Sequence, residues 1–236
     1  MAASSDVKLL GSRLSPFVNR VQIALNLKSV DHEFILENLQ AKSELLLKSN
    51  PIHKKVPVLI HNHKSICESL VIVQYIDEAF PDGPSILPSN PFDRSTARFW
   101  AAYIDDKWFP VFRMLADVKQ DEESRAAVLE KMTEGLVPLE DVFLKFSNGK
   151  GFFGGDTLGY IDIVLGCYLR GINATEIHLG RKILDETKIP ALAEWARRFI
   201  SHEAVKGAFP ETEEFLNLFK TMESAKAAAA ESEASN

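Results

Sequence analysis

A serine followed by a proline, Ser15-Pro16, stands where a predicted helix begins. Serine is a preferred cap for a helix N-terminus, and proline is preferred at the first helical position. The unpaired N–H groups and the dipole at such a terminus favour an anion. A thiolate bound there would meet the Ser15 hydroxyl and partial positive charge, both of which lower a thiol pKa. The alternative is that Ser15 only caps the helix.

Histidines and lysines suggest other sites. His61 and His63 lie on a polar turn without a third ligand nearby, which is more typical of solvated surface than of a metal site. Lys42 and the pair Lys54-Lys55 are either solvated, as most lysines are, or meet the carboxylates of an acidic ligand. The sequence therefore predicts no bound metal and leaves the role of the lysines open.

The run Gly149-Lys150-Gly151-Phe152-Phe153-Gly154 matches the G-x-G-x-x-G pattern of dinucleotide-binding proteins. The pattern has this meaning only between the first strand and helix of a βαβ unit, whereas here it lies in a region of helical periodicity. We interpret it as a turn leading to a helix that starts near Gly159, where Asp162 can bond back to the backbone as half of a capping box. Dinucleotide binding is therefore rejected.

The first eighty residues are typical of an α/β unit. The expected elements are strand 7–10, helix 16–28, strand 32–36, a helical turn at 42–48, strands 58–60 and 65–67, and helix 68–80. The first three elements form a βαβ unit with parallel strands, and the last two strands form a hairpin. Helix 68–80 is apolar nearly all round, so we expect it to be covered on both sides. Ser15 follows the first strand at its carboxyl end, where α/β units place their ligands.

The composition changes after residue 80. Four prolines, with glycine and serine among them, fall within 81–91 and indicate a linker. From Arg94 onward only helical periodicity is present, which predicts a bundle. The Ala- and Glu-rich end has no large apolar group and is expected to fray. The predicted organisation is an α/β domain at 1–82, a linker at 83–92, an all-helical domain at 93–222 and a frayed tail at 223–236.

Composition limits the partners. The 236 residues carry a net charge of −6, from 27 basic and 33 acidic side chains, so the chain has no basic footprint for nucleic acid or an acidic membrane. Two cysteines are too few for a disulfide framework and suit a reducing compartment. Neither a signal-peptide pattern nor a membrane-length apolar run is present. We therefore expect a cytoplasmic protein.

Three blocks of sequence together resemble the cytosolic glutathione transferases, specifically the plant tau class: Ser15-Pro16-Phe17, the run 50–59 (NPIHKKVPVL) and the run 66–69 (ICES). The resemblance extends from about Val7 to about Phe219. It implies a thioredoxin-like α/β N-terminal domain, an all-α helical C-terminal domain with a hydrophobic substrate site, and a homodimer. Glutathione would be a co-substrate, and no other cofactor is implied.

The resemblance also implies roles for single residues. Ser15 is the catalytic residue, whose hydroxyl donates to the glutathione thiolate. Val56-Pro57 matches a cis-proline turn whose backbone pairs with the cysteinyl unit. Glu68 takes the γ-glutamyl ammonium, and Ser69 takes its carboxylate at a helix N-terminus. The implied glutathione-binding residues are Phe17, Lys42, Lys55, Val56, Pro57, Glu68 and Ser69, with Lys42 and Lys55 holding the glycyl carboxylate.

The hydrophobic substrate site is implied at Arg13, Leu14, Phe109, Arg113 and Ala116. Tau sequences usually carry a tryptophan two residues before the catalytic serine, where this chain has Arg13. An arginine at the mouth of an apolar pocket favours electrophiles with a carboxylate or sulfonate, unless its head group turns to water.

The implied reaction is conjugation of glutathione to hydrophobic electrophiles, as in detoxification of foreign compounds, with hydroperoxide reduction by the same thiolate as a further activity. A thiol oxidoreductase is disfavoured because Ser15 stands where a cysteine is needed. A non-catalytic carrier of hydrophobic metabolites stays open. In the dimer, Glu78 is expected to pair with Arg94 or Arg98 of the partner subunit.

Overall fold

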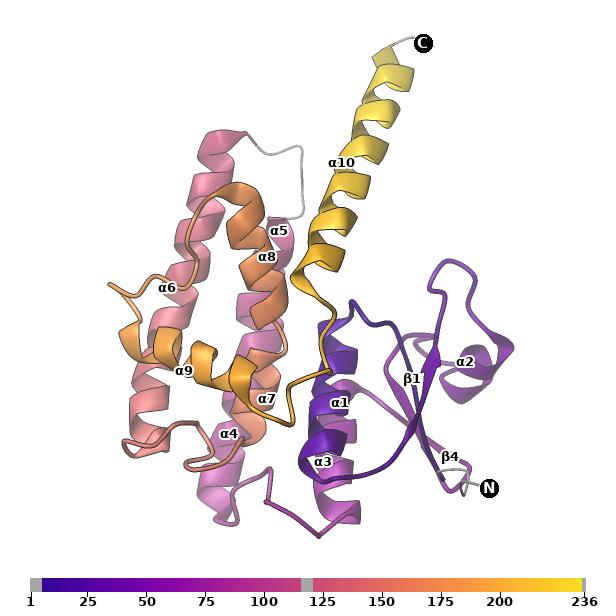
Figure 1. Cartoon of the computed structure of the whole chain (residues 1–236), viewed down its shortest axis with the longest axis vertical. Helices are drawn as coiled ribbons and strands as arrows, with labels where there is room; N and C mark the ends of the chain where they lie inside the picture. The colour runs from indigo at the N-terminus through magenta and orange to yellow at the C-terminus, as the bar shows by residue number, and fades with distance from the viewer. Residues whose placement is uncertain (1–5, 116–120, 235–236) are drawn as a thin grey trace.

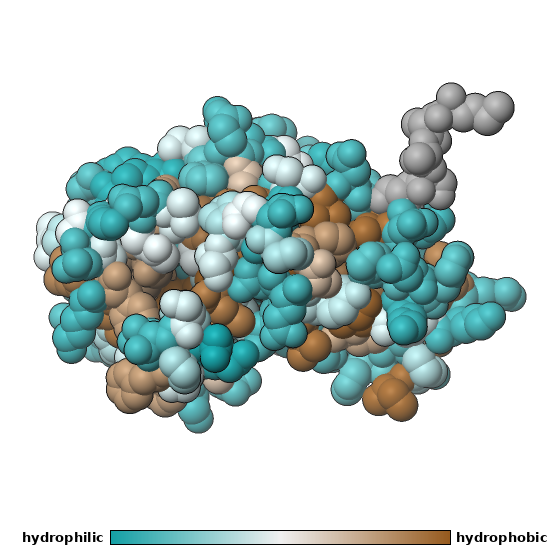
Figure 2. All heavy atoms as spheres, turned by 90° about the horizontal axis from the view of Figure 1, so that it is seen from below, coloured by the Kyte–Doolittle hydropathy of each residue, from teal (hydrophilic) through white to brown (hydrophobic). Residues whose placement is uncertain are grey.

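The computed structural model describes residues 6–115 and 121–234. A smaller half, coloured indigo to purple in Figure 1, is built on a sheet, and a larger half, coloured magenta to yellow, is built of helices. On the face shown in Figure 2 the surface is mainly hydrophilic, with smaller hydrophobic groups between. The expected fold class, a thioredoxin-like α/β half followed by an all-helical half, is confirmed.

The sheet orders its strands β2-β1-β3-β4. The strands are β1 (Val7–Gly11), β2 (Glu33–Leu36), β3 (Val58–His61) and β4 (Lys64–Cys67). β1 and β2 are parallel, as predicted, and β3 runs antiparallel to both β1 and β4. Asn62 and His63 connect β3 to β4, and both have positive φ, which is the geometry of a two-residue type I′ hairpin turn.

Three helices cover the sheet. α1 (Pro16–Leu27) and α3 (Ser69–Ala79) lie side by side on the face that is turned toward the helical half (Figure 1). The short α2 (Glu44–Ser49) lies on the other side of the sheet, where Leu46 packs against Leu10 and Val58. The Ser15 turn, which joins β1 to α1, is thereby held between a buried strand and a buried helix.

α3 is buried along one side only. Ile72, Val73 and Ile76 are buried, whereas Val71 is 51% exposed and Glu78 is exposed. The expectation that this helix is covered on both sides is wrong for the single chain, because no described element of the chain packs over the side that carries Val71.

The larger half starts at α4 (Pro91–Tyr103), passes through the π-helical segment η1 (Ile104–Trp108) and continues into α5 (Phe109–Met114). The remaining helices are α6 (Glu122–Ser147), α7 (Tyr160–Gly166), α8 (Leu169–Leu179), α9 (Pro190–Ser201) and α10 (Thr212–Ala234). α4 begins inside the predicted linker, because Asn90 caps it through Oδ1, which accepts from the Phe92 and Asp93 N–H groups at 2.8 and 3.3 Å.

One hydrophobic core runs through both halves. It includes Val18 of α1 and Ile72 of α3 together with Ile163 of α7 and Trp195 of α9. α7 is buried along its whole length and contacts α1, α4 and α9. Because the two halves share this core, walls from both can form one site.

The G-x-G-x-x-G run forms a structural turn, as we interpreted it. The buried Asp162 carboxylate accepts from the N–H groups of Phe153, Gly154 and Gly159 at 3.0, 2.9 and 2.8 Å, and from Trp195 Nε1 at 2.7 Å. Burial raises the pKa of Asp162 to about 6, although the four donors oppose that shift. The predicted helix start at Gly159 with its Asp162 capping box is confirmed.

The C-terminal end differs from the expectation of a frayed tail at 223–236. α10 continues as a helix to Ala234, and Glu223 pairs with His178 at 3.1 Å. Alanine has the highest helix propensity, so an Ala-rich segment extends a helix whose first turns are anchored.

Candidate functional site

Ser15 lies at the N-terminus of α1, immediately after β1 and its short loop. Its backbone carbonyl accepts from the N–H groups of Val18 and Asn19 at 3.0 and 3.1 Å, but its side chain makes no capping hydrogen bond. The side chain is partly exposed. The Ser15 hydroxyl therefore does not cap α1, so the alternative that this residue serves only as a side-chain cap has no support.

The loop that leads to β3 is shaped by Asn50. This buried side chain donates from Nδ2 to the Lys55 carbonyl at 3.0 Å, and its Oδ1 accepts from the His53 N–H at 3.1 Å. The Val56–Pro57 peptide bond that follows is cis, as the resemblance implies. Sequence reasoning assigned Asn50 no role, although an asparagine directly before Pro51 is a recognisable turn signal.

Glu68 and Ser69 form the corner between β4 and α3. Glu68 has φ +70° and ψ +115°, an uncommon conformation for a residue with a side chain. Its carboxylate is exposed and lies 3.8 Å from His53 Nε2. Ser69 is buried as the first residue of α3, and its Oγ accepts from Arg20 Nη1 at 3.2 Å. The corner thus places a carboxylate and a hydroxyl at the start of a helix, close to the Asn50 loop.

Arg20 supports this corner through its hydrogen bond to Ser69. The sequence analysis did not identify it. It is fully buried in α1, and its Nη1 and Nη2 lie 2.8 and 2.5 Å from the two carboxylate oxygens of Asp105 in η1. Nη2 also donates to the Tyr168 hydroxyl at 2.9 Å and to the Val164 carbonyl at 3.1 Å. Burial alone lowers the pKa of Arg20, but Cys167, Tyr168 and Asp105 raise it overall, so the guanidinium stays charged.

The other implied glutathione-binding side chains are two lysines and Phe17. Lys42 and Lys55 are exposed, on the stretches before α2 and after it. The Phe17 ring turns toward the helical half, in edge-on contact with Phe109 at a centroid distance of 5.3 Å. The Arg20 guanidinium lies 5.1 Å from the centroid of the same ring. Phe17 therefore packs between the halves.

An apolar pocket of about 340 Å³ opens beside the Ser15 turn. Leu14 and Pro16 form one wall, and Phe109, Phe112 and Arg113 of α5 form another. Of the implied substrate-site residues, the structure brings Leu14, Phe109 and Arg113 together here. Arg13 is exposed and does not line the pocket, and Ala116 lies outside the described residues.

The α10 helix supplies a further wall that the sequence interpretation missed. Phe215, Leu218, Phe219 and Met222 all face the pocket. These residues recur at positions i, i+3, i+4 and i+7, the spacing of one apolar stripe on a helix. That spacing could have indicated a pocket wall, but an apolar stripe on a helix indicates core packing equally well.

Metal and membrane features are absent from the described part of the chain. Among the side chains that the structure describes, those of residues 6–115 and 121–225, no cluster of three or more His, Cys, Asp or Glu is placed to hold a metal ion. None of the helices in those ranges is long and apolar enough to cross a membrane.

Comparison with known proteins agrees with this arrangement. Residues 9–85 match the family model of the glutathione S-transferase N-terminal domain, and residues 99–203 match that of the C-terminal domain. The chain is 54% identical over 211 residues to glutathione S-transferase U17 of Arabidopsis thaliana, covering 89% of this chain and 92% of that protein. The chain therefore belongs to the glutathione S-transferase family.

Solved structures narrow the assignment. A tau class glutathione S-transferase from mango, Mangifera indica, superposes with a TM-score of 0.88 at 54% identity, covering 93% of this chain and 100% of that one. A rice glutathione S-transferase in complex with glutathione superposes with a TM-score of 0.84 at 35% identity, covering 94% and 100%. Within the family, this chain is a member of the tau class.

Proposed function

We propose that the protein conjugates glutathione to hydrophobic electrophiles, with Ser15 as the residue that stabilises the reacting thiolate. The observation that carries this proposal is the Ser15 hydroxyl, which the helix does not use as a cap, next to Pro16, which lines the apolar pocket. Glutathione sulfur at this point has a donor on one side and a space for an apolar partner on the other.

The energetic demand on Ser15 is modest. Lowering a free thiol pKa from about 8.5 by about two units requires ~2.7 kcal/mol of preferential thiolate stabilisation. One charge-assisted hydrogen bond from a hydroxyl, added to the field at the start of α1, is of that size. The sulfur then forms its bond to the electrophilic carbon, and the leaving group departs with the electron pair. No side chain has to act as a covalent nucleophile.

The polar corner accounts for the peptide part of glutathione. The Val56 backbone beside the cis bond pairs with the cysteinyl unit, and Glu68 and Ser69 take the γ-glutamyl ammonium and carboxylate. Lys42 and Lys55 take the glycyl carboxylate. The rice relative solved in complex with glutathione supports this ligand for the shared fold.

The open sides of α3 and α4 support a homodimer. Val71 is 51% exposed, Phe92 75% and Phe99 62%, which is a large apolar surface for a single chain. Glu78 is exposed, and the Arg98 Nε donates to Gln74 Oε1 at 2.8 Å. We infer that this surface packs against a second copy and that Glu78 pairs with Arg94 or Arg98 of the partner subunit.

The cysteines argue against thiol–disulfide chemistry and fit a cytoplasmic setting. Both Cys67 and Cys167 are free thiols, as expected for a reducing compartment. Burial and the neighbouring Glu68 raise the pKa of Cys67, which disfavours its thiolate form.

Initial rates with a generic aryl halide test the proposed activity directly. Turnover in wild type, lost in Ser15→Ala, supports conjugation. Tight glutathione binding without turnover by wild type would favour a carrier of hydrophobic metabolites instead.

A further inference from the structure

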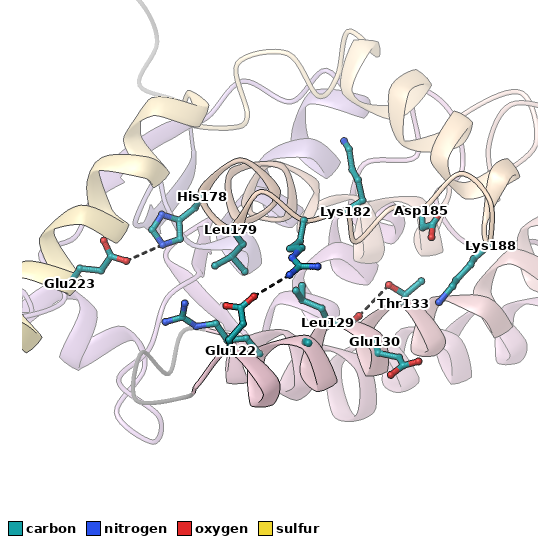
Figure 3. A pocket seen from close by; sticks show the side chains of 13 residues that line it. Glu122, Leu129, Glu130, Thr133, His178, Leu179, Lys182, Asp185, Lys188 and Glu223 are labelled. Carbon is teal, nitrogen blue, oxygen red and sulfur yellow. Dashed lines mark hydrogen bonds and ion pairs between the residues drawn. The ribbon is translucent and has the colours of Figure 1, made fainter.

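The apolar pocket beside Ser15 adjoins a second, polar cavity at the far end of α8. This cavity, of about 480 Å³, lies between the start of α6, the end of α8 and the segment that leads to α9 (Figure 3). Arg125, His178, Leu179 and Glu223 line both spaces. The two spaces therefore meet at a shared wall made by α6, α8 and α10.

Most charged groups at this wall are already paired. His178 Nε2 lies 3.1 Å from a carboxylate oxygen of Glu223, and Arg181 Nη2 on the polar side lies 3.1 Å from Glu122 (Figure 3). Arg125 is different: among residues 6–115 and 121–225, whose side chains the structure describes, no carboxylate lies within 4.0 Å of its guanidinium. A partly buried arginine thus faces both spaces without an acidic partner in the described chain.

The lining of the apolar pocket likewise carries more positive than negative charge. Its charged lining residues are Arg113, Arg125, His178 and Glu223, and His178 already engages Glu223. Counting only the residues that the structure describes, two guanidinium groups are left for a ligand, in a space otherwise walled mainly by aromatic and aliphatic side chains. A guanidinium presents a planar fork of donors that matches a carboxylate. An anionic group on the ligand would balance this pocket.

We propose that the pocket takes an elongated, amphipathic second substrate, with its electrophilic carbon near Pro16 and a carboxylate at Arg125. The apolar body would lie against Phe219, whose ring is 5.2 Å from His178. The inference rests on the proposed function, because it assigns a substrate class to the same site. The volume of about 340 Å³ is within the usual range for small-molecule sites.

For an unsaturated aldehyde with such a carboxylate tail, the chemistry is conjugate addition. Glutathione sulfur bonds to the β-carbon, the electrons of the double bond move to the α-carbon, and that carbon takes a proton from solvent. No oxidant or reductant is consumed. Arg125 acts only by binding the far end of the molecule, so its effect should depend on the tail and not on the reacting group.

The test compares two aldehydes of equal length, trans-2-nonenal and the same chain ending in a carboxylate, 9-oxonon-7-enoate. The readout is the kcat/KM for the acid divided by that for the neutral aldehyde, because effects on the thiolate cancel in this ratio. Wild type should favour the acid. Arg125→Gln should lower the ratio about tenfold, the effect of losing one hydrogen-bonded charge, and Arg125→Lys should keep most of the preference.

Arg181→Gln is the matched control. It removes a guanidinium from the polar cavity alone, so the ratio should stay within about twofold of the wild-type value, as for an exposed ion pair. A second readout uses non-reacting chains: decanoate should inhibit aryl-halide conjugation more strongly than decanol in wild type, and the difference should disappear in Arg125→Gln.

These measurements distinguish failure of the Arg125 inference from failure of the proposed conjugation activity. If wild type shows no preference for the acid, or if Arg125→Gln leaves both the ratio and decanoate inhibition unchanged, the inference is wrong and conjugation itself stands. If wild type conjugates neither the aldehydes nor the aryl halide, the proposed function fails.

Discussion

The Arg20 guanidinium on α1 and the Asp105 carboxylate in η1 form a two-pronged ion pair, with N–O distances of 2.8 and 2.5 Å. The pair joins the sheet half to the helical half, and the same arginine donates to Ser69 at the corner proposed for the γ-glutamyl group. The ion pair between the two halves is therefore linked, through Arg20, to the position of the Ser69 hydroxyl.

Removing one partner of this pair should be costly. Asp105→Asn or Arg20→Met should lower the free energy of unfolding by about 3–5 kcal/mol, because each leaves a buried polar group without its charge partner. Folded Asp105→Asn protein should also show a raised KM for glutathione, since the Arg20 that holds Ser69 is less well fixed. Urea denaturation and glutathione kinetics measure the two effects.

Arg197→Met is the control for this prediction. Arg197 pairs with Glu186 at 2.7 Å, but both side chains are more than half exposed. The free energy of unfolding should change by less than about 1 kcal/mol. If Arg197→Met and Arg20→Met lower the free energy of unfolding equally, the buried pair does not stabilise the protein more than an exposed one.

Replacing Asp162 by asparagine should destabilise the protein far more than the same replacement at another helix-capping aspartate. Its two oxygens accept from four N–H groups, and an asparagine in its place could accept on one side only, leaving buried donors unpaired. Asp162→Asn should lower the free energy of unfolding by about 2–4 kcal/mol. Asp121, an exposed cap that accepts from the Ser124 N–H at 2.7 Å, offers the comparison. Asp121→Asn should cost under about 0.5 kcal/mol because asparagine caps equally well, so similar thermal shifts for the two variants would refute the assignment.

The α10 wall should affect the second substrate and not glutathione. Phe219→Ala removes an aromatic ring from the pocket. For a large apolar electrophile it should lower kcat/KM roughly tenfold, since about 1–3 kcal/mol of apolar contact is lost. The KM for glutathione should stay close to wild type. If Phe219→Ala instead raises the KM for glutathione and leaves kcat/KM for the electrophile unchanged, α10 does not form part of the electrophile site.

The proposed dimer contact should set orientation more than strength. Glu78→Ala should raise the dimer dissociation constant by only a few-fold and weaken its dependence on salt, because an exposed ion pair contributes up to about 1 kcal/mol. Analytical ultracentrifugation at two salt concentrations measures both. An unchanged constant and an unchanged salt dependence would remove Glu78 from the interface.

The sheet half could be predicted from sequence because its signals are local. Apolar runs ended by turn residues gave the strands, and Ser15-Pro16 marked the start of α1. The Gly149–Gly154 run was interpreted correctly because Asp162 lies at the capping position of the next helix.

What the sequence did not reveal depends on distant pairs. Arg20 and Asp105 are 85 positions apart, and an isolated arginine reads as surface until its partner is known. The one-sided burial of α3 depends on which elements pack over the helix. The hydrophobic pattern of the segment does not show which elements these are. Arg13 was assigned to the pocket mouth by resemblance, with its head group in water left as an alternative; the structure has it exposed and outside the pocket lining, whereas Arg125, far along the chain, lines the pocket.

The most direct test of the central claim is ultraviolet difference titration of bound glutathione in wild type and in Ser15→Ala. We expect a thiolate band in wild type that appears about two pH units below the free thiol pKa, and its loss together with aryl-halide turnover in the variant. A thiolate band that titrates identically in the two proteins would contradict the role given to Ser15.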